Sequence, residues 1–261
     1  MTLPLSIQAH IEGKTGHTDS VGMSGSSVTV FEDCVLKIEA VTPCTEQTVA
    51  AMDWLARRIP SPKVLAHEIR DGRSFLLMSR IPGEMSCDPA CLARPEMLVS
   101  LLADAMTLLW KVDAAGCPRD RRLPALLKEA RWRVENGLVD LDNVEPETFG
   151  PGGFESPEAL LRWLEENPVA SCPVLTHGDF CLPNVFQLEG KFSGFVDVGD
   201  AGLGEKWRDI ALCWRSLRSN MHGAYGGRAY PDFDPDVLFD ALGIKPDRAQ
   251  LRWHLLLDEL F

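Results

Sequence analysis

Long apolar runs are absent from this chain of 261 residues. No stretch approaches the roughly 18 consecutive apolar residues that a membrane-spanning helix needs. The chain also begins without the basic segment and the long apolar segment of a secretory signal peptide. The sequence therefore predicts a soluble protein of the cytoplasm, with no membrane partner.

Cysteine pairs of the kind that bind zinc are absent as well. None of the eight cysteines forms a Cys-x-x-Cys pair, and histidines are not interleaved with them at zinc spacing. We expect reduced, mostly buried thiols instead of metal clusters.

Basic residues are too few for a general nucleic-acid-binding protein. The 26 lysines and arginines face 38 aspartates and glutamates, which gives a formal net charge of −12. This balance fits a small polycationic ligand, although a solubilising surface is the simpler explanation of net charge alone. The one dense basic cluster, Arg119 to Arg122, is predicted to lie on a solvated loop.

The apolar pattern changes near residue 80. Before it, short runs at 27–31, 34–38 and 75–78 are typical of a small antiparallel sheet, interrupted by one helix near 46–57. After it, helical segments follow near 95–111, 124–136, 157–166, 204–219 and 246–260. This order predicts an α+β protein with a small β-rich lobe over 1–80, a larger and mostly helical lobe over 81–261, and a hinge near 79–83.

The run Thr-His-Gly-Asp-Phe-Cys-Leu-Pro-Asn at 176–184 carries the strongest functional signal. Thirteen residues after Asn184, an apolar strand ends in Asp197-Val-Gly. Phosphoryl transfer from a nucleotide to a hydroxyl needs one carboxylate that orients the hydroxyl, and an amide oxygen with a second carboxylate that hold Mg²⁺. Asp179, Asn184 and Asp197 supply these three groups.

Local folding explains how these residues would meet. Two short apolar strands, 185–188 and 191–196, flank the tight turn Glu189-Gly190 and predict a β-hairpin. A hairpin returns the chain to its start. The residues just before and just after it, which include Asn184 and Asp197, would therefore face one cleft.

The spacing of these residues resembles that of the protein kinases. Four residues separate Asp179 from Asn184, and the following Asp-x-Gly has Val198 where kinases have phenylalanine. The wider set of motifs resembles the aminoglycoside 3′-phosphotransferases, which are bacterial antibiotic-resistance kinases. The matching motifs are His-Gly-Asp-x-Cys-Leu-Pro-Asn at 177–184, Ser-Gly-Phe-Val-Asp-Val-Gly at 193–199, Trp-Arg-Asp-Ile-Ala-Leu at 207–212 and Leu-Leu-Asp-Glu-Leu-Phe at 256–261.

The resemblance runs essentially end to end and implies a two-lobed, protein-kinase-like fold with ATP and Mg²⁺ in the cleft. In this family a lysine contacts the nucleotide phosphates and is held by an acid. Lys37 is that lysine, and Glu46 is the best candidate partner, with Glu39 as the alternative. Ser24 belongs to the predicted phosphate-covering loop, and the backbone at the positions 79 and 81 would hydrogen-bond the adenine edge, which names Ser79 and Ile81.

Three positions depart from the family pattern. Val35 replaces an aromatic residue that stacks on adenine, Thr48 stands where the acidic partner of the lysine is expected, and Asp200 replaces an arginine after Asp-x-Gly. These departures leave open a weakly active, kinase-like nucleotide-binding protein.

On the acceptor side, Asp179 is the predicted catalytic base for a 3′-hydroxyl. His177 is expected to hold the loop, and Asp209 to brace it as a buried acid. Alternatively, a related kinase would act on another amino alcohol or sugar. The chain is expected to be a monomer or a weak homodimer that binds no nucleic acid.

Aminoglycosides carry several ammonium groups, so their recognition requires clustered anions. The resemblance assigns substrate binding to an acidic loop, to an arginine near a helix end and to the end of the chain, namely Asp140, Asp142, Glu147, Arg218, Asp258, Glu259 and Phe261. A solvated loop and a surface arginine are the alternatives. Acids at the C-terminal end of a helix oppose its dipole, so we expect a cation there.

Overall fold

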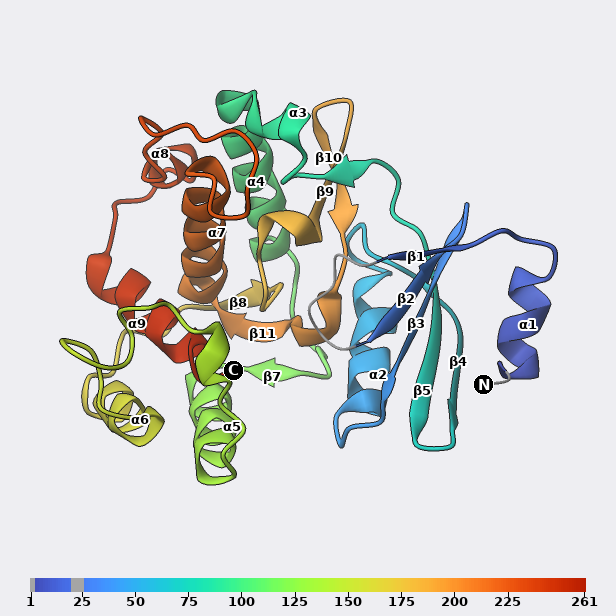
Figure 1. Ribbon diagram of the computed structural model, residues 1–261, viewed down its shortest axis with the longest axis horizontal. Helices are drawn as coiled ribbons and strands as arrows, with labels where there is room; N and C mark the ends of the chain where they lie inside the picture. The colour runs from blue at the N-terminus through green and yellow to red at the C-terminus, as the bar shows by residue number, and fades with distance from the viewer. Residues whose placement is uncertain (1–2, 20–25) are drawn as a thin grey trace.

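The computed structural model describes residues 3–19 and 26–261, and its first part is a sheet of five strands (Figure 1). The strands lie in the order β1-β2-β3-β5-β4, and all neighbouring pairs are antiparallel. Their bounds are β1 (His17–Asp19), β2 (Ser27–Val30), β3 (Cys34–Ala40), β4 (Val64–Arg70) and β5 (Arg73–Ser79). The predicted antiparallel sheet is confirmed, with β1 and β4 added to the strands that the sequence located.

The two faces of β3 have different surroundings. Leu36 and Ile38 are buried in a cluster with Ile7. Because side chains alternate along a strand, Lys37 and Glu39 point to the opposite face. That face borders the larger part of the molecule.

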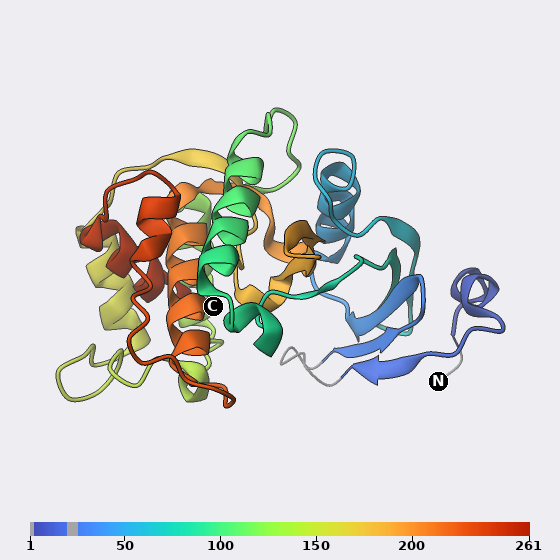
Figure 2. The ribbon, with the colours of Figure 1, turned by 90° about the horizontal axis from the view of Figure 1, so that it is seen from above.

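Helices cover both faces of this sheet (Figures 1 and 2). Helix α1 (Leu5–Ile11) packs on the face that buries Leu77, whereas helix α2 (Thr45–Leu55) shares a cluster with Leu76 on the other face. The helix predicted near 46–57 is thus confirmed as α2. Helix α1 was not foreseen.

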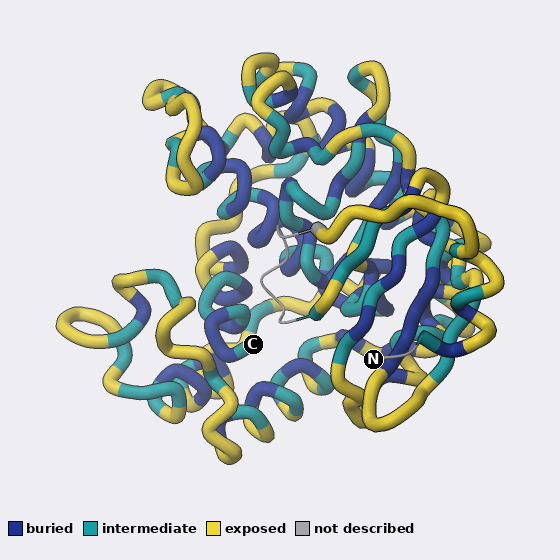
Figure 3. The backbone as a smooth tube through the Cα atoms, turned by 45° about the vertical axis from the view of Figure 1, so that its right-hand side comes forward, coloured by how far each residue is buried: buried dark blue, intermediate teal, exposed yellow. Residues whose placement is uncertain are grey.

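Helices are the main elements of the remaining chain. The bounds are α3 (Pro89–Leu92), α4 (Pro95–Trp110), α5 (Leu123–Glu135), α6 (Pro157–Glu166), α7 (Lys206–Met221), α8 (Val237–Ala241) and α9 (Arg248–Asp258). Helices α4 and α7 supply much of the main core, in which Leu102, Met106 and Leu217 are fully buried. Figure 3 shows this burial along the inner sides of the helices. Each helix predicted after residue 90 is confirmed within a few residues, because its apolar positions recur with helical spacing.

Two small sheets lie next to these helices. In one, β9 (Val185–Leu188) pairs with β10 (Lys191–Phe195) and with β6 (Glu84–Met85). The predicted hairpin is confirmed, and its turn residues Glu189 and Gly190 both have positive φ, 53° and 80°, as a tight two-residue hairpin turn requires.

In the other small sheet, β11 (Gly202–Glu205) pairs in parallel with β7 (Asp120–Arg121) and antiparallel with β8 (Pro173–Thr176). The solvated loop predicted over Arg119 to Arg122 is therefore wrong for Arg119 and Arg121, whereas Asp120 and Arg122 are exposed. Arg119 and Arg121 are only 8% and 4% exposed. Arg119 binds Asp200, and Arg121 binds Glu129 and Asp200, so that carboxylates compensate the burial of both guanidinium groups.

The expectation of mostly buried thiols also needs correction. All eight cysteines are free, but only Cys34, Cys91 and Cys213 are buried, while Cys44 and Cys172 are exposed. The exposed pair precedes α2 and β8, where the chain runs over the surface. None of the helices in the described ranges is long and apolar enough to cross a membrane. The sheet ends at Ser79, and the hinge at 79–83 stays a prediction.

Acid should weaken this fold through His254 of α9. The ring is 1% exposed, and burial, with the nearby Arg208 charge, lowers its pKa from 6.5 to about 3. A depressed pKa contributes stability above pH 6.5 that is lost as the pH falls toward 3. Between pH 6.5 and 5 the loss should be about 2 kcal/mol of unfolding free energy.

Urea unfolding at both pH values, for the wild type, His254→Leu and the exposed-histidine control His222→Gln, measures this term. The wild type and the control should lose about 2 kcal/mol more than His254→Leu between the two pH values. Equal losses in all three proteins would show that His254 does not titrate in this way.

Candidate active site

The loop that carries the predicted catalytic base, residues 177–184, joins β8 to β9 and is fixed by helix α7. Asp209 of α7 accepts the N–H of His177 at 2.8 Å and that of Gly178 at 2.9 Å. Nε2 of the buried His177 ring lies 2.9 Å from the carbonyl oxygen of Val196, the residue that follows the second strand of the hairpin. The predicted structural roles of His177 and Asp209 are confirmed.

Burial raises the pKa of the Asp209 carboxyl to about 6. His177 and the two backbone N–H groups favour the charged form and oppose this rise. Gly178 has φ +84°, and a Cβ there would lie 2.4 Å from the Asp200 carbonyl oxygen. Only glycine fits this turn, so the direction of the chain into Asp179 is set by backbone contacts.

The side chain of Asp179 is held by its neighbours in the same loop. The Cys181 thiol donates to Oδ1 at 3.0 Å, and burial, together with the Asp179 charge, raises the pKa of that thiol well above its usual value. The amide nitrogen of Asn184 donates to Oδ2 at 2.8 Å and to the Asp179 carbonyl at 3.0 Å. The predicted base and the predicted amide ligand are therefore adjacent.

The hairpin brings the third predicted group to the same side. The Val196 N–H donates to the Asn184 carbonyl at 2.9 Å, which ties the two open ends of the hairpin together. Asp197 follows directly, with φ 51°, and its side chain is 55% exposed. Asp197 Oδ1 lies 3.6 Å from Lys37 Nζ, so the end of the hairpin meets the sheet.

The partner of Lys37 is Glu39, at 3.1 Å, not Glu46. Glu46 is exposed in the first turn of α2. Two residues further on, Thr48 faces the cleft in its place, because two positions turn a helix by about 200°. Burial opposes the charge of Lys37, yet the carboxylates of Asp197 and Glu39 raise the pKa of its ammonium group.

A cavity of about 680 Å³ lies between the sheet and the hairpin. Its lining includes four of the predicted residues, Lys37, Ser79, Ile81 and Asp197, together with apolar residues such as Val28, Val35, Leu76, Met78, Phe186 and Val198. The N–H of Ile81 has no backbone acceptor among the described residues and remains able to donate to a ligand, whereas the N–H of Ser79 donates to Lys63. Ser24 lies outside the described residues.

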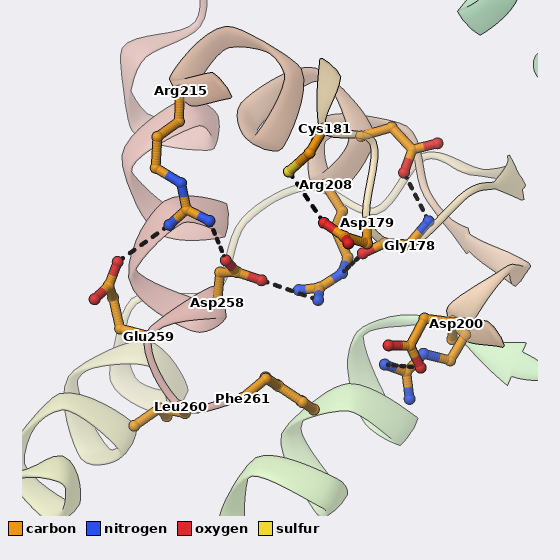
Figure 4. A network of polar contacts seen from close by, with 12 residues as sticks. Gly178, Asp179, Cys181, Asp200, Arg208, Arg215, Asp258, Glu259, Leu260 and Phe261 are labelled. Carbon is orange, nitrogen blue, oxygen red and sulfur yellow. Dashed lines mark hydrogen bonds and ion pairs between the residues drawn. The ribbon is translucent and has the colours of Figure 1, made fainter. Parts of the chain in front are cut away.

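The acidic end of the chain is already paired with arginines (Figure 4). Asp258 binds Arg208 at 3.1 Å and also binds Arg215, and Glu259 binds Arg215 at 3.2 Å. The terminal Phe261 accepts a hydrogen bond from Arg133 through its main-chain oxygen. The cations expected at this helix end are supplied by the protein itself.

The predicted acidic loop lies nearby but is mostly exposed. Asp140 caps a short helical turn by accepting the N–H of Asp142 at 3.1 Å, and both are exposed. Glu147, Arg218 and Glu259 line a second cavity of about 680 Å³ with Trp163 and Trp214. The structure thus gathers three of the seven predicted acceptor residues around one cavity.

Asp200 is the departure that the structure explains best. Its carboxylate binds Arg119 at 2.8 Å and Arg121 at 3.4 Å. Burial disfavours its charge, but Arg121 and Arg119 hold the pKa of the carboxyl below its usual value. The extra acid next to Asp-x-Gly is therefore neutralised by neighbouring arginines.

Sequence reasoning missed several residues of this site. Arg119, Arg121 and Arg215 carried no motif signal, and Arg208 lies in the Trp-Arg-Asp-Ile-Ala-Leu motif but was given no role. Each of these arginines meets its acidic partner only in the fold. For Glu39, the strand alternation that places it on the same face as Lys37 was available as a signal.

Comparisons with known proteins agree with this geometry. Residues 35–254 match the family model described as the phosphotransferase enzyme family. Aminoglycoside 3′-phosphotransferases from Enterococcus faecalis and Staphylococcus aureus are 34% and 33% identical, each over 93% of this chain and 92% of the relative. The one from Escherichia coli is 31% identical over 99% of this chain and 95% of the relative.

Solved structures show the same fold. Aminoglycoside phosphotransferase APH(3″)-Id from Streptomyces rimosus superposes with a TM-score of 0.80 at 24% identity, over 97% of this chain and 95% of that chain. An aminoglycoside-3′-phosphotransferase of type VIII gives a TM-score of 0.80 at 24% identity, over 98% and 97%. The fold is thus the two-part, kinase-like α+β fold of these enzymes. With a family model that covers most of the chain and relatives above 30% identity along nearly their full length, this chain belongs to the phosphotransferase enzyme family, among the aminoglycoside 3′-phosphotransferases.

Proposed function

We propose that this protein transfers the γ-phosphoryl group of ATP to the 3′-hydroxyl of aminoglycoside antibiotics and thereby confers resistance. The observation that carries this proposal is the Asp179 side chain, fixed by Asn184 and Cys181 in a loop whose hairpin delivers Asp197 to Lys37. The sequence similarity to the aminoglycoside 3′-phosphotransferases named above is the second support. We place the reaction in the cytoplasm, in a monomer or a weak homodimer.

ATP would occupy the cavity between the sheet and the hairpin. Its apolar walls suit a flat base, and the Ile81 N–H remains able to donate to the adenine edge. The Lys37 ammonium group lies in the same cavity and would contact the phosphates. Val35 supplies an aliphatic wall in place of a stacking ring, and the phosphate-covering role of Ser24 stays a proposal.

Asn184 and Asp197 would hold Mg²⁺. Both offer oxygen atoms, the ligands that this ion prefers. The hydrogen bonds from Asn184 to Asp179 use its amide nitrogen and leave its amide oxygen for the metal. When bound, the ion neutralises charge on the transferred phosphate.

Asp179 would accept or orient the proton of the acceptor hydroxyl. The protonated Cys181 thiol and the Asn184 amide hold one carboxylate oxygen each, so the rotation of the side chain is restricted. Fixed geometry of this kind supplies much of the acceleration in phosphoryl transfer.

A second candidate is a related kinase that phosphorylates another amino alcohol or a sugar. It is favoured by the pairing of Asp258, Glu259 and the chain end with arginines, which leaves less negative charge for a polycation. Asp140, Asp142, Glu147, Arg218, Asp258, Glu259 and Phe261 remain our proposed acceptor residues.

An ADP-release assay with ATP and Mg²⁺ tests the function. Kanamycin should stimulate turnover, and an aminoglycoside that lacks the 3′-hydroxyl should not. Chelation of Mg²⁺ by EDTA should abolish the signal, and added Mg²⁺ should restore it. Turnover with other amino alcohols but not with kanamycin would move the assignment to the second candidate.

Replacement of the base gives a sharper test. Asp179→Asn should lower kcat by about 100-fold or more, because general-base assistance and orientation are lost. The KM for ATP should stay within about twofold, since Asp179 does not line the ATP cavity. Asp104→Asn, an exposed acid on α4, is the control and should match the wild type. A kcat of Asp179→Asn equal to that of the control would remove Asp179 from the mechanism.

Replacement of the cleft lysine tests the nucleotide side. Lys37→Met should raise the KM for ATP by about 10-fold or more, because a charged hydrogen bond contributes roughly 1.5–3 kcal/mol. Lys14→Met removes a lysine that also pairs with an acid, Asp33, but lies outside the cleft. An unchanged KM in Lys37→Met would contradict the proposed phosphate contact.

A further inference from the structure

Arg208 of α7 connects the catalytic loop to the end of the chain. Its Nε donates to the Gly178 carbonyl at 3.0 Å, and its Nη2 lies 3.1 Å from Asp258 Oδ1. The side chain is only 3% exposed. Figure 4 shows the guanidinium group between Asp258 and the loop that carries Gly178 and Asp179. A single buried side chain therefore joins two segments that meet only in the fold.

Two consecutive residues of α7 hold both polar groups of Gly178. Asp209 accepts its N–H at 2.9 Å, and Arg208 donates to its carbonyl at 3.0 Å. Asp179 is the next residue in the chain. A shift of the Gly178 carbonyl would therefore move the Asp179 carboxylate as well.

A buried guanidinium group is costly unless its donors are paired. The guanidinium group of Arg208 makes only two hydrogen-bonded contacts, and its Nη1 has no hydrogen-bond partner among the described residues. The Phe261 ring, 5.3 Å from the guanidinium carbon, covers it. Each of its two hydrogen-bonded contacts should consequently be strongly coupled to the other.

Asp258 also binds a second arginine, whose other partner is a different acid. Arg215 binds the other carboxylate oxygen of Asp258 and continues to Glu259, at 3.2 Å. Arg208 binds the first oxygen and continues to the catalytic loop. Asp258 thus binds two arginines in a similar way, and only Arg208 continues by a hydrogen bond to the loop that carries Asp179.

We propose that Arg208 is a positioning residue for phosphoryl transfer, which holds the loop of Asp179 at a fixed place relative to Asp258 at the acceptor end of α9. This inference rests on the proposed function. Small displacements of a reacting group lower rates by about 100-fold. Loss of Arg208 should therefore lower kcat and leave nucleotide binding unchanged.

Steady-state kinetics of Arg208→Gln, Arg208→Lys, Asp258→Asn and the double variant Arg208→Gln/Asp258→Asn test this role. Arg208→Gln should reduce kcat about 10- to 100-fold with the KM for ATP within about twofold of the wild type. The kcat of Arg208→Lys should fall between those of the wild type and Arg208→Gln, because a lysine reaches one of the two partners but not both. The kcat of the double variant should lie within about threefold of the kcat of the slower single variant, because both changes break the same connection.

Arg215→Gln serves as the comparison on the same acid, and should raise the KM for the acceptor with kcat within about twofold. Arg131→Gln, which removes an exposed ion pair with Glu165, is the neutral control. Kinetics are measured only for variants that melting curves show to be folded at the assay temperature. If Arg208→Gln does not fold, Arg208→Lys and Asp258→Asn carry the test.

An Arg208 variant with wild-type kcat, or multiplicative effects in the double variant, would overturn the inference. So would equal kcat losses in Arg208→Gln and Arg215→Gln, since Arg215 acts on Cys181 only through its charge and hydrogen-bonds Asp258 and Glu259, not the loop, among the described residues. Absence of turnover in the wild type with every acceptor would instead refute the proposed function, so the two failures are distinguishable.

Discussion

The two hydrogen bonds that hold the N–H and the carbonyl of Gly178 are the constraint on which the proposed catalytic centre depends. Its N–H binds Asp209 and its carbonyl binds Arg208, both from the start of α7. A Cβ at this turn would collide with the Asp200 carbonyl, so the loop has little freedom to relax. Because α7 is also a main part of the core, the position of Asp179 is tied to a helix that is packed on several sides.

Charge near the site is organised by arginines that are buried or half-buried. The chain carries a net charge of −12, yet the acids near the site are paired: Asp200 with Arg119 and Arg121, and Asp258 with Arg208 and Arg215. A polycationic acceptor would therefore join or replace existing ion pairs. This differs from a site with unpaired carboxylates, and under the proposed function the arginines would influence which acceptors bind.

Local patterns predicted the parts of the fold that short-range forces control. The helices after residue 90 followed from the 3.6-residue spacing of their apolar side chains, and the hairpin at 185–195 followed from its turn. The site residues Asp179, Asn184 and Asp197 lie around that same hairpin, so their proximity followed as well. The partner of Lys37 was placed wrongly, because the choice between Glu39 and Glu46 depends on helix phase and strand face together.

The sequence by itself determined the order of the longer helices, the hairpin and the identity of the groups around it, since these depend on periodicity, turn chemistry and motif spacing. Only the tertiary structure decided which charges meet. Arg208 and Asp258, or Arg121 and Asp200, are brought together by the packing of α7, α9 and the small sheet of β7, β11 and β8. A buried ion pair leaves no periodic trace in the chain, because its two members are chosen by distance in space and by the need to compensate burial.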